Sequence, residues 1–132
     1  MSAMTTLPST PLTLMIPLPF ESFHVYELKP GAPDHFVISI TSATYADRRE
    51  HQFLTVVPLR DFSIRYDHPL LVIVDPLQNR DVDIPTEKAA YVGAVQSLPQ
   101  HILFPQSRGE VSERVKQELR RKLSGYLDLQ EA

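Results

Sequence analysis

FVISI at 36–40 and FLTVVPL at 53–59 are two apolar runs rich in β-branched residues, and a polar stretch at 41–51 separates them. Such runs are typical of β-strands, because branched and aromatic side chains pack well on a pleated surface. Pro58 lies within the second run, and we expect the regular part of that strand to end at Val57. The two runs predict strands joined by the polar stretch.

Further short apolar runs on either side of this pair predict more strands. The run 70–74 (LLVIV) is the most apolar, and we expect it to be central in the sheet. The segment 82–84 is a candidate hairpin partner for it, across a polar turn. Gly93, inside the run 89–95, is expected to mark a bulge or the close approach of another backbone. The other predicted strands are 23–28 and 62–66.

The C-terminal part of the chain predicts a helix over 111–125. Ser112 is a suitable N-cap, and Gly125 is a suitable end. A shorter helix is predicted over 98–103. Short strands followed by one helix favour a mainly β (α+β) fold, a small antiparallel barrel or sandwich with the helix packed across it. The expected buried stripe of the long helix is Val111, Val115, Leu119, Leu123 and Tyr126.

Length and composition limit the class of protein. The 132 residues suit one domain, expected at 20–129, and the four prolines among the first 19 residues predict an irregular N-terminal arm at 1–19. Cysteine is absent, which excludes disulfides and thiolate metal ligands and permits a reducing, cytoplasmic location. No apolar run is long enough to span a membrane. The net charge of −3 disfavours a strong electrostatic nucleic-acid binder but leaves room for a local basic groove.

The acidic and imidazole side chains are weak candidates for chemistry. The five histidines lack the spacing of metal ligands, so we expect no metal and no cofactor. Asp34 and His35 lie in the turn before a strand, where His35 could serve as a general base; the alternative is that they only support the turn. Asp81 and Asp83 could form a carboxylate pair, although a solvated hairpin edge is the more frequent meaning of such spacing.

The arginines give a stronger signal. Arg48 and Arg49 lie in the loop between the two opening runs, and Arg60 follows the second run directly. Guanidinium groups at a strand end beside a loop can bind phosphate or stabilise the charge of a phosphoryl-transfer transition state. The alternative is ordinary solvated charge, with Arg60 paired to Asp61 or Asp34.

The order of these segments resembles the MazF/PemK toxins of toxin–antitoxin modules. The resemblance rests on the strand 36–40, the polar loop, the strand ending in Val-Pro-Leu at 57–59, and SRGEVS at 107–112 leading into the helix. The segments 23–31 and 93–98 are also similar to the related CcdB toxins. The match runs from about Phe23 to Leu127, and each motif is short. It implies an SH3-like barrel with a C-terminal helix, usually dimeric.

Several positions depart from the family pattern. MazF-type ribonucleases usually carry Arg-Pro before the second strand, where this chain has Asp34-His35. The usual Thr or Ser after Val-Pro-Leu is Arg60, and a later Asp-Gln pair is replaced by Gly93-Ala94. The Trp-Gly-Ile ending that CcdB toxins use against gyrase is also missing. The usual RNA-cleaving constellation therefore does not transfer residue by residue.

Two functions follow from the resemblance. The first is a cytoplasmic toxin of a type II toxin–antitoxin module, acting as a metal-independent endoribonuclease, with His35 and Arg60 catalytic and Arg48 and Arg49 binding substrate. The second is a non-catalytic barrel that binds a protein partner. The resemblance implies an antitoxin or another protein as partner, RNA as a further ligand, and a homodimer. The missing motif residues favour the second function, and the family favours the first.

Overall fold

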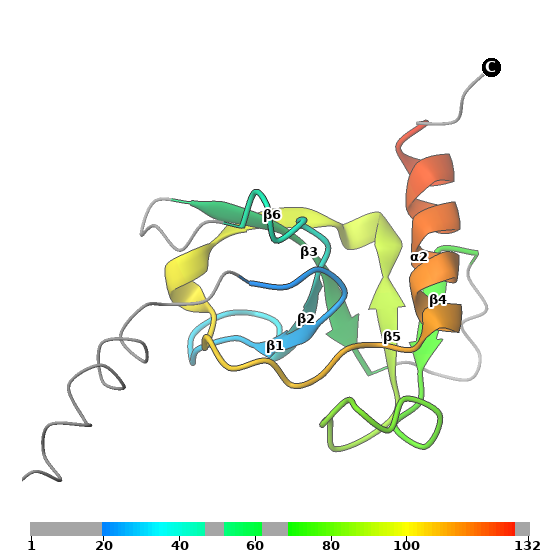
Figure 1. Ribbon diagram of the computed structural model, residues 1–132, viewed down its shortest axis with the longest axis horizontal. Coiled ribbons are helices and arrows are strands. Elements are labelled where there is room, and N and C mark those ends of the chain that lie inside the picture. Colours follow the sequence, from blue (N-terminus) through cyan, green and yellow to red (C-terminus); the bar gives the residue numbers. More distant parts are fainter. Residues whose placement is uncertain (1–19, 47–51, 62–68, 129–132) are drawn as a thin grey trace, which may run out of the picture.

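The computed structural model describes residues 20–46, 52–61 and 69–128. Six antiparallel strands lie in these ranges, ordered β1-β2-β3-β5-β4 in one sheet, with β6 also paired to β3 (Figure 1). The mainly β (α+β) prediction is confirmed. The strands are β1 (Val25–Glu27), β2 (Phe36–Ser39), β3 (Phe53–Arg60), β4 (Leu71–Val74), β5 (Lys88–Tyr91) and β6 (Gln96–Pro99), and the helix α2 is Glu113–Tyr126.

The long strand β3 pairs with other strands along both of its edges, and Pro58 lies where the pairing along the second edge is interrupted. One edge pairs with β2, from Phe36 opposite Leu59 to Ser39 opposite Val56. The other edge carries β6 along its first half and β5 at its end. Alternation of the ladder turns the backbone nitrogen of Pro58 toward this second edge, where it has no N–H to donate. The interruption between β5 and β6 falls there, and the 3₁₀ helix η2 (Val92–Ala94) fills it.

Both faces of the sheet are buried. Successive side chains of a strand point to opposite faces, so Phe36 and Ile38 belong to one apolar cluster and Val37 to the other. The first cluster lies under α2, and the second contains Phe20, Tyr26, Leu54 and Leu103 among others. This double burial explains why β2 is apolar at nearly every position.

The helix α2 follows its predicted pattern. The Ser112 side chain accepts a hydrogen bond from the Val115 N–H, and Val115, Leu119 and Leu123 are buried. The helix packs near β4, and Lys122 Nζ donates to the Leu71 carbonyl at 2.8 Å (Figure 1). The last residue of the predicted buried stripe, Tyr126, is not buried, because it is 48% exposed. The helix begins at Glu113 rather than at residue 111, and it ends at Tyr126 rather than at Gly125.

The free edge of β1 is covered by the segment 102–111, which connects the sheet to α2. Val25 N–H donates to the Gly109 carbonyl at 2.9 Å, and Arg108 N–H donates to the Val25 carbonyl at 2.7 Å. Phe104 N–H donates to the Glu27 carbonyl at 2.9 Å. On its other side the Arg108 carbonyl accepts from the Asp83 N–H at 2.7 Å, so the segment lies between β1 and the loop that contains Asp83 (Figure 1).

Four predictions about the elements differ from the structure. The run 70–74 is not central, because β4 stands last in the strand order, and its apolar character comes from packing with α2. The segment 82–84 is a loop and not the partner of β4, which pairs with β5. Asn79 explains the difference, because its amide donates to the Asp75 carbonyl at 3.0 Å and accepts from the Ser112 N–H at 2.6 Å, which ties the loop to the helix start. Val82 and Ile84 are still buried, which accounts for their strand-like pattern.

The predicted strand 89–95 and helix 98–103 were also wrong in part. The strand stops at Tyr91, because the chain turns through η2 before it rejoins β3 as β6. The region 98–103 holds the end of β6 and the 3₁₀ helix η3 (Gln100–Ile102). A Cβ at Gly93 would lie 3.3 Å from the Leu70 side chain, so the approach there is close but involves a side chain. The predicted arm 1–19 and strand 62–66 lie outside the described residues.

Across the described ranges, no helix is long and apolar enough to cross a membrane.

Candidate functional site

Charged residues gather at one end of the sheet, because four strands begin or end there. β1 ends at Glu27, β3 ends at Arg60 and β5 begins at Lys88. His35 directly precedes β2, and its carbonyl accepts a hydrogen bond from the Leu28 N–H at 2.8 Å. The antiparallel topology thus brings together residues that lie far apart in the sequence.

Arg60 forms a two-point ion pair with Asp34. Nε lies 2.8 Å from Oδ1, and Nη2 lies 3.3 Å from Oδ2. The Asp34 side chain is 8% exposed and that of Arg60 is 42% exposed. The hydrogen bond that Arg60 donates to the Asp34 carboxylate raises the pKa of Arg60 above its ordinary value. The guanidinium also lies over the Tyr91 ring, with Cζ 5.3 Å from the ring centroid.

His35 is held by a second carboxylate. Its Nε2 lies 3.0 Å from Glu27 Oε2, and its ring stacks on Phe36 with 4.1 Å between the centroids. Glu27 Oε1 also accepts from Arg108 Nη2 at 2.5 Å. The hydrogen bonds from Arg108 and then from His35 lower the pKa of Glu27, so the carboxylate stays ionised and can orient the imidazole.

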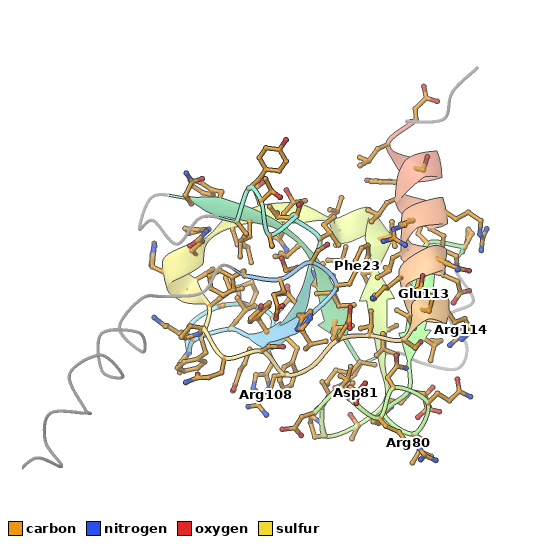
Figure 2. The ribbon with its side chains drawn as sticks, in the orientation of Figure 1. Phe23, Arg80, Asp81, Arg108, Glu113 and Arg114 are labelled. Atoms are coloured by element: carbon orange, nitrogen blue, oxygen red, sulfur yellow. The ribbon has the colours of Figure 1, made fainter. Side chains whose placement is uncertain are left out.

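Carboxylates also accompany the other cations of this region. Lys88 Nζ lies 2.9 Å from Asp61 Oδ1, and Arg108 Nη1 lies 3.1 Å from Asp83 Oδ2. Both cations lie over the Phe36 ring, 5.8 Å and 5.7 Å from its centroid. Figure 2 shows Arg108 on the side of the molecule where the 102–111 segment meets the loop that contains Asp81. The positive charges of Arg60, Lys88 and Arg108 are therefore locally compensated.

An open pocket of about 370 Å³ lies beside His35 and Asp34. The β1–β2 loop forms most of it, and the partly exposed ring of Phe104 contributes a wall. A planar group can stack on such a ring while the neighbouring charged groups hold its polar edge. The lining residues are Glu27, Leu28, Lys29, Pro30, Ala32, Pro33, Asp34, His35 and Phe104.

The structure brings two of the four predicted site residues together. His35 directly precedes Phe36, which pairs with Leu59, the residue before Arg60. His35 contacts Glu27 and Arg60 contacts Asp34, so the two lie at the same end of the sheet with different carboxylate partners. Of the two partners considered for Arg60, the structure selects Asp34. Arg48 and Arg49 lie outside the described residues.

The sequence analysis missed Glu27, Lys88 and Arg108 as parts of this region. Glu27 carried a signal, because it is a charged residue on the otherwise apolar face of an alternating strand. Arg108 precedes Gly109, whose φ of +108° and close approach to the Asp81 carbonyl fix the local backbone. No local pattern marks Lys88, since its role depends on the pairing of β5 with β3.

The remaining candidates show no catalytic arrangement. Asp83 pairs with Arg108, and 81–83 is not a strand, so the proposed carboxylate pair on one strand face is not formed. No group of three or more histidine and acidic side chains in the described ranges could hold a metal ion.

Solved structures share this architecture. No protein-family model matches the chain, and no curated protein is similar to it in sequence. A mycobacterial endoribonuclease solved with its cognate antitoxin is 16% identical with a TM-score of 0.64, covering 84% of this chain and 97% of its own.

Two further toxin structures are similar to this chain to about the same degree. A MazF toxin of Mycobacterium tuberculosis is 14% identical with a TM-score of 0.63, covering 82% of this chain and 99% of its own. A chain of the MazE–MazF complex of Deinococcus radiodurans is 14% identical with a TM-score of 0.65, covering 85% of this chain and 99% of its own. The chain therefore has the fold of the MazF toxins.

Proposed function

We propose that the protein is the toxin of a type II toxin–antitoxin module and cleaves single-stranded RNA without a metal ion. The observation that carries the proposal is the placement of His35 and Arg60 at the same end of the sheet, with His35 held by Glu27 at 3.0 Å. The shared fold supports it, because similar structures include an endoribonuclease solved with its antitoxin. In this proposal the protein acts in the cytoplasm and is restrained by an antitoxin.

The chemistry needs a base and a stabiliser of charge. Neutral His35 accepts the proton of an RNA 2′-hydroxyl, and the 2′-oxygen forms a bond to the adjacent phosphorus. The bond from phosphorus to the 5′-oxygen breaks, and that oxygen takes up a proton from water as it leaves. The products are a 2′,3′-cyclic phosphate and a 5′-hydroxyl. The guanidinium of Arg60 stabilises the extra negative charge of the pentavalent phosphorus.

Other residues supply binding rather than chemistry. In the proposal, Glu27 fixes the orientation of the imidazole through its contact with His35 Nε2. The pocket beside Phe104 accepts an unstacked base of single-stranded RNA, which aromatic side chains commonly bind. Arg48 and Arg49 hold neighbouring phosphates.

A second candidate function is a non-catalytic protein-binding module. Ion pairing favours it, because Arg60, Lys88 and Arg108 each contact a carboxylate of the chain itself. A surface with both signs of charge interspersed is well suited to a protein partner, which can exchange these pairs for pairs of its own.

The two functions are separated by a cleavage assay with purified protein, single-stranded RNA and EDTA. The endoribonuclease predicts cleavage by the wild-type chain, loss of cleavage in His35→Ala and in Arg60→Ala, and an unchanged rate in Arg114→Ala. Arg114 is the matched control, since it is another exposed arginine with a carboxylate partner, Glu118, at 2.7 Å. Intact RNA with the wild-type chain would exclude the ribonuclease and leave the binding module.

A further inference from the structure

The Asp34 carboxylate occupies the edge of Arg60 that a phosphate would use. A guanidinium presents parallel N–H groups that match the oxygens of a carboxylate and of a phosphate equally well. Asp34 takes the Nε–Nη2 edge of Arg60 at 2.8 Å and 3.3 Å. The Asp34 carboxylate thus makes the same two-point contact with Arg60 that a phosphate would make.

The guanidinium is already oriented for such a contact. Its Cζ lies 5.3 Å from the centroid of the Tyr91 ring, which restricts the plane of the group. The backbone of Arg60 belongs to β3 and pairs with Ala89 of β5. A ligand therefore meets a cation whose position is fixed by the sheet, and little ordering is needed on binding.

The Asp34 carboxylate, in contrast to the Arg60 guanidinium, comes from a loop and not from a strand. Asp34 lies at the end of the β1–β2 loop, directly after the turn that contains Gly31 with its φ of +104°. Asp34 and five preceding loop residues line the pocket, so a ligand in the pocket lies next to the ion pair. Since the Arg60 side chain is 42% exposed, water and solutes reach the guanidinium.

We propose that Arg60 is a latent phosphodiester-binding site that Asp34 keeps occupied, and that an RNA phosphate binds by displacing the Asp34 carboxylate. The inference rests on the proposed RNA-cleaving function, and it assigns Asp34 as a positioning residue that weakens substrate binding. Exchange of one anion for another leaves the charge of the guanidinium compensated throughout. Loss of the carboxylate should leave Arg60 available to RNA at once.

The test is the affinity of the full chain for a single-stranded 2′-O-methyl RNA oligomer, which the proposed reaction cannot cleave. Asp34→Asn should bind about two- to fivefold more tightly than wild type, the range expected for an ion pair that is partly exposed. Asp34→Asn should keep the wild-type slope of log affinity against log salt, because Arg60 contacts the phosphate in both complexes, whereas Arg60→Ala should flatten the slope by about 0.7 through the loss of one phosphate contact. A merely structural role for Asp34 would leave the affinity unchanged or lower it.

Three variants complete the experiment. Glu118→Gln makes the same change in net charge on α2 and should keep the wild-type affinity. Asp34→Asn combined with Arg60→Ala should lose the whole gain in affinity. Asp34→Ser, which also removes the carboxylate, repeats the measurement if Asp34→Asn does not fold.

The outcomes separate this inference from the proposed function. Wild-type RNA cleavage with unchanged affinity in Asp34→Asn and Asp34→Ser would overturn the latent site and leave the ribonuclease standing. Tighter, Arg60-dependent binding by Asp34→Asn without cleavage by any variant would support the latent site and reject the ribonuclease. Absence of oligomer binding by every variant would overturn the latent site.

Discussion

Asp34, just before β2, and Arg60, the last residue of β3, form a two-point ion pair at 2.8 Å and 3.3 Å. These are two of the positions at which the sequence departs from the MazF pattern. The pattern places an arginine before the second strand and a small hydroxyl residue after Val-Pro-Leu. In this chain the guanidinium comes from the opposite strand, and an acidic residue stands where the arginine is usual.

Leu119 is fully buried in the middle of the α2 stripe. Leu119→Ala should lower the free energy of unfolding by about 2–5 kcal/mol, because it removes apolar contacts and leaves a cavity. Urea denaturation measures the change. Leu127→Ala is the control, since Leu127 is 46% exposed, and it should cost much less. A loss under about 0.5 kcal/mol in Leu119→Ala would show that the helix is not docked on the sheet as described.

Gly109 cannot accept a side chain. Its φ is +108°, and a Cβ would lie 1.5 Å from the Asp81 carbonyl oxygen, which belongs to backbone. Gly31 is the matched control, with a φ of +104° and open space where a Cβ would lie. Gly31→Ala should cost about 1–2 kcal/mol from the left-handed conformation alone. Gly109→Ala should be clearly more destabilising in the same thermal-unfolding measurement, and equal losses would contradict the close approach of the two loops.

Much of the fold can be predicted from the spacing of apolar residues along the sequence. The candidate site depends instead on which distant strands pair with each other. The strand β2 and the helix stripe were predicted because apolar spacing reports burial directly. The segment 82–84 was misassigned because Val82 and Ile84 are buried in a loop that Asn79 anchors to the helix start, and burial alone does not distinguish loop from strand. Lys88 and Arg108 reach the site through strand pairing between distant segments. Single-sequence patterns do not encode that register.

Glu27 should make the folding stability of the protein depend on pH in the acid range. Arg108 and His35 hold its folded-state pKa below the ordinary 4.5, so its contribution is present above that value and is lost as pH falls through the lowered pKa. Glu27→Gln should therefore be less stable than wild type near neutral pH, and the difference should shrink in acid. Thermal midpoints of both proteins across the acid range measure this, and a constant difference would argue against the network.

Self-association is expected from the exposed apolar surface and the resembled families. Tyr45, Phe53 and Leu77 are 75%, 59% and 81% exposed, and β4 stands last in the strand order of the sheet, where an edge can pair with another chain. We predict a homodimer, as two-fold pairs are the commonest way to bury such surfaces. Sedimentation velocity over a range of concentrations tests it. A monomer at every concentration, with no protein partner, would contradict the prediction.

The most direct test of the central claim is expression of the wild-type chain in a bacterial host, followed by analysis of total RNA and of its new 3′ ends. The account predicts arrested growth, fragmented RNA and fragments that end in 2′,3′-cyclic phosphate. Arg60→Ala should restore growth and intact RNA while its thermal midpoint stays close to that of wild type. Normal growth with intact RNA would contradict the ribonuclease, and fragmentation that persists in Arg60→Ala would show that the activity resides elsewhere in the chain.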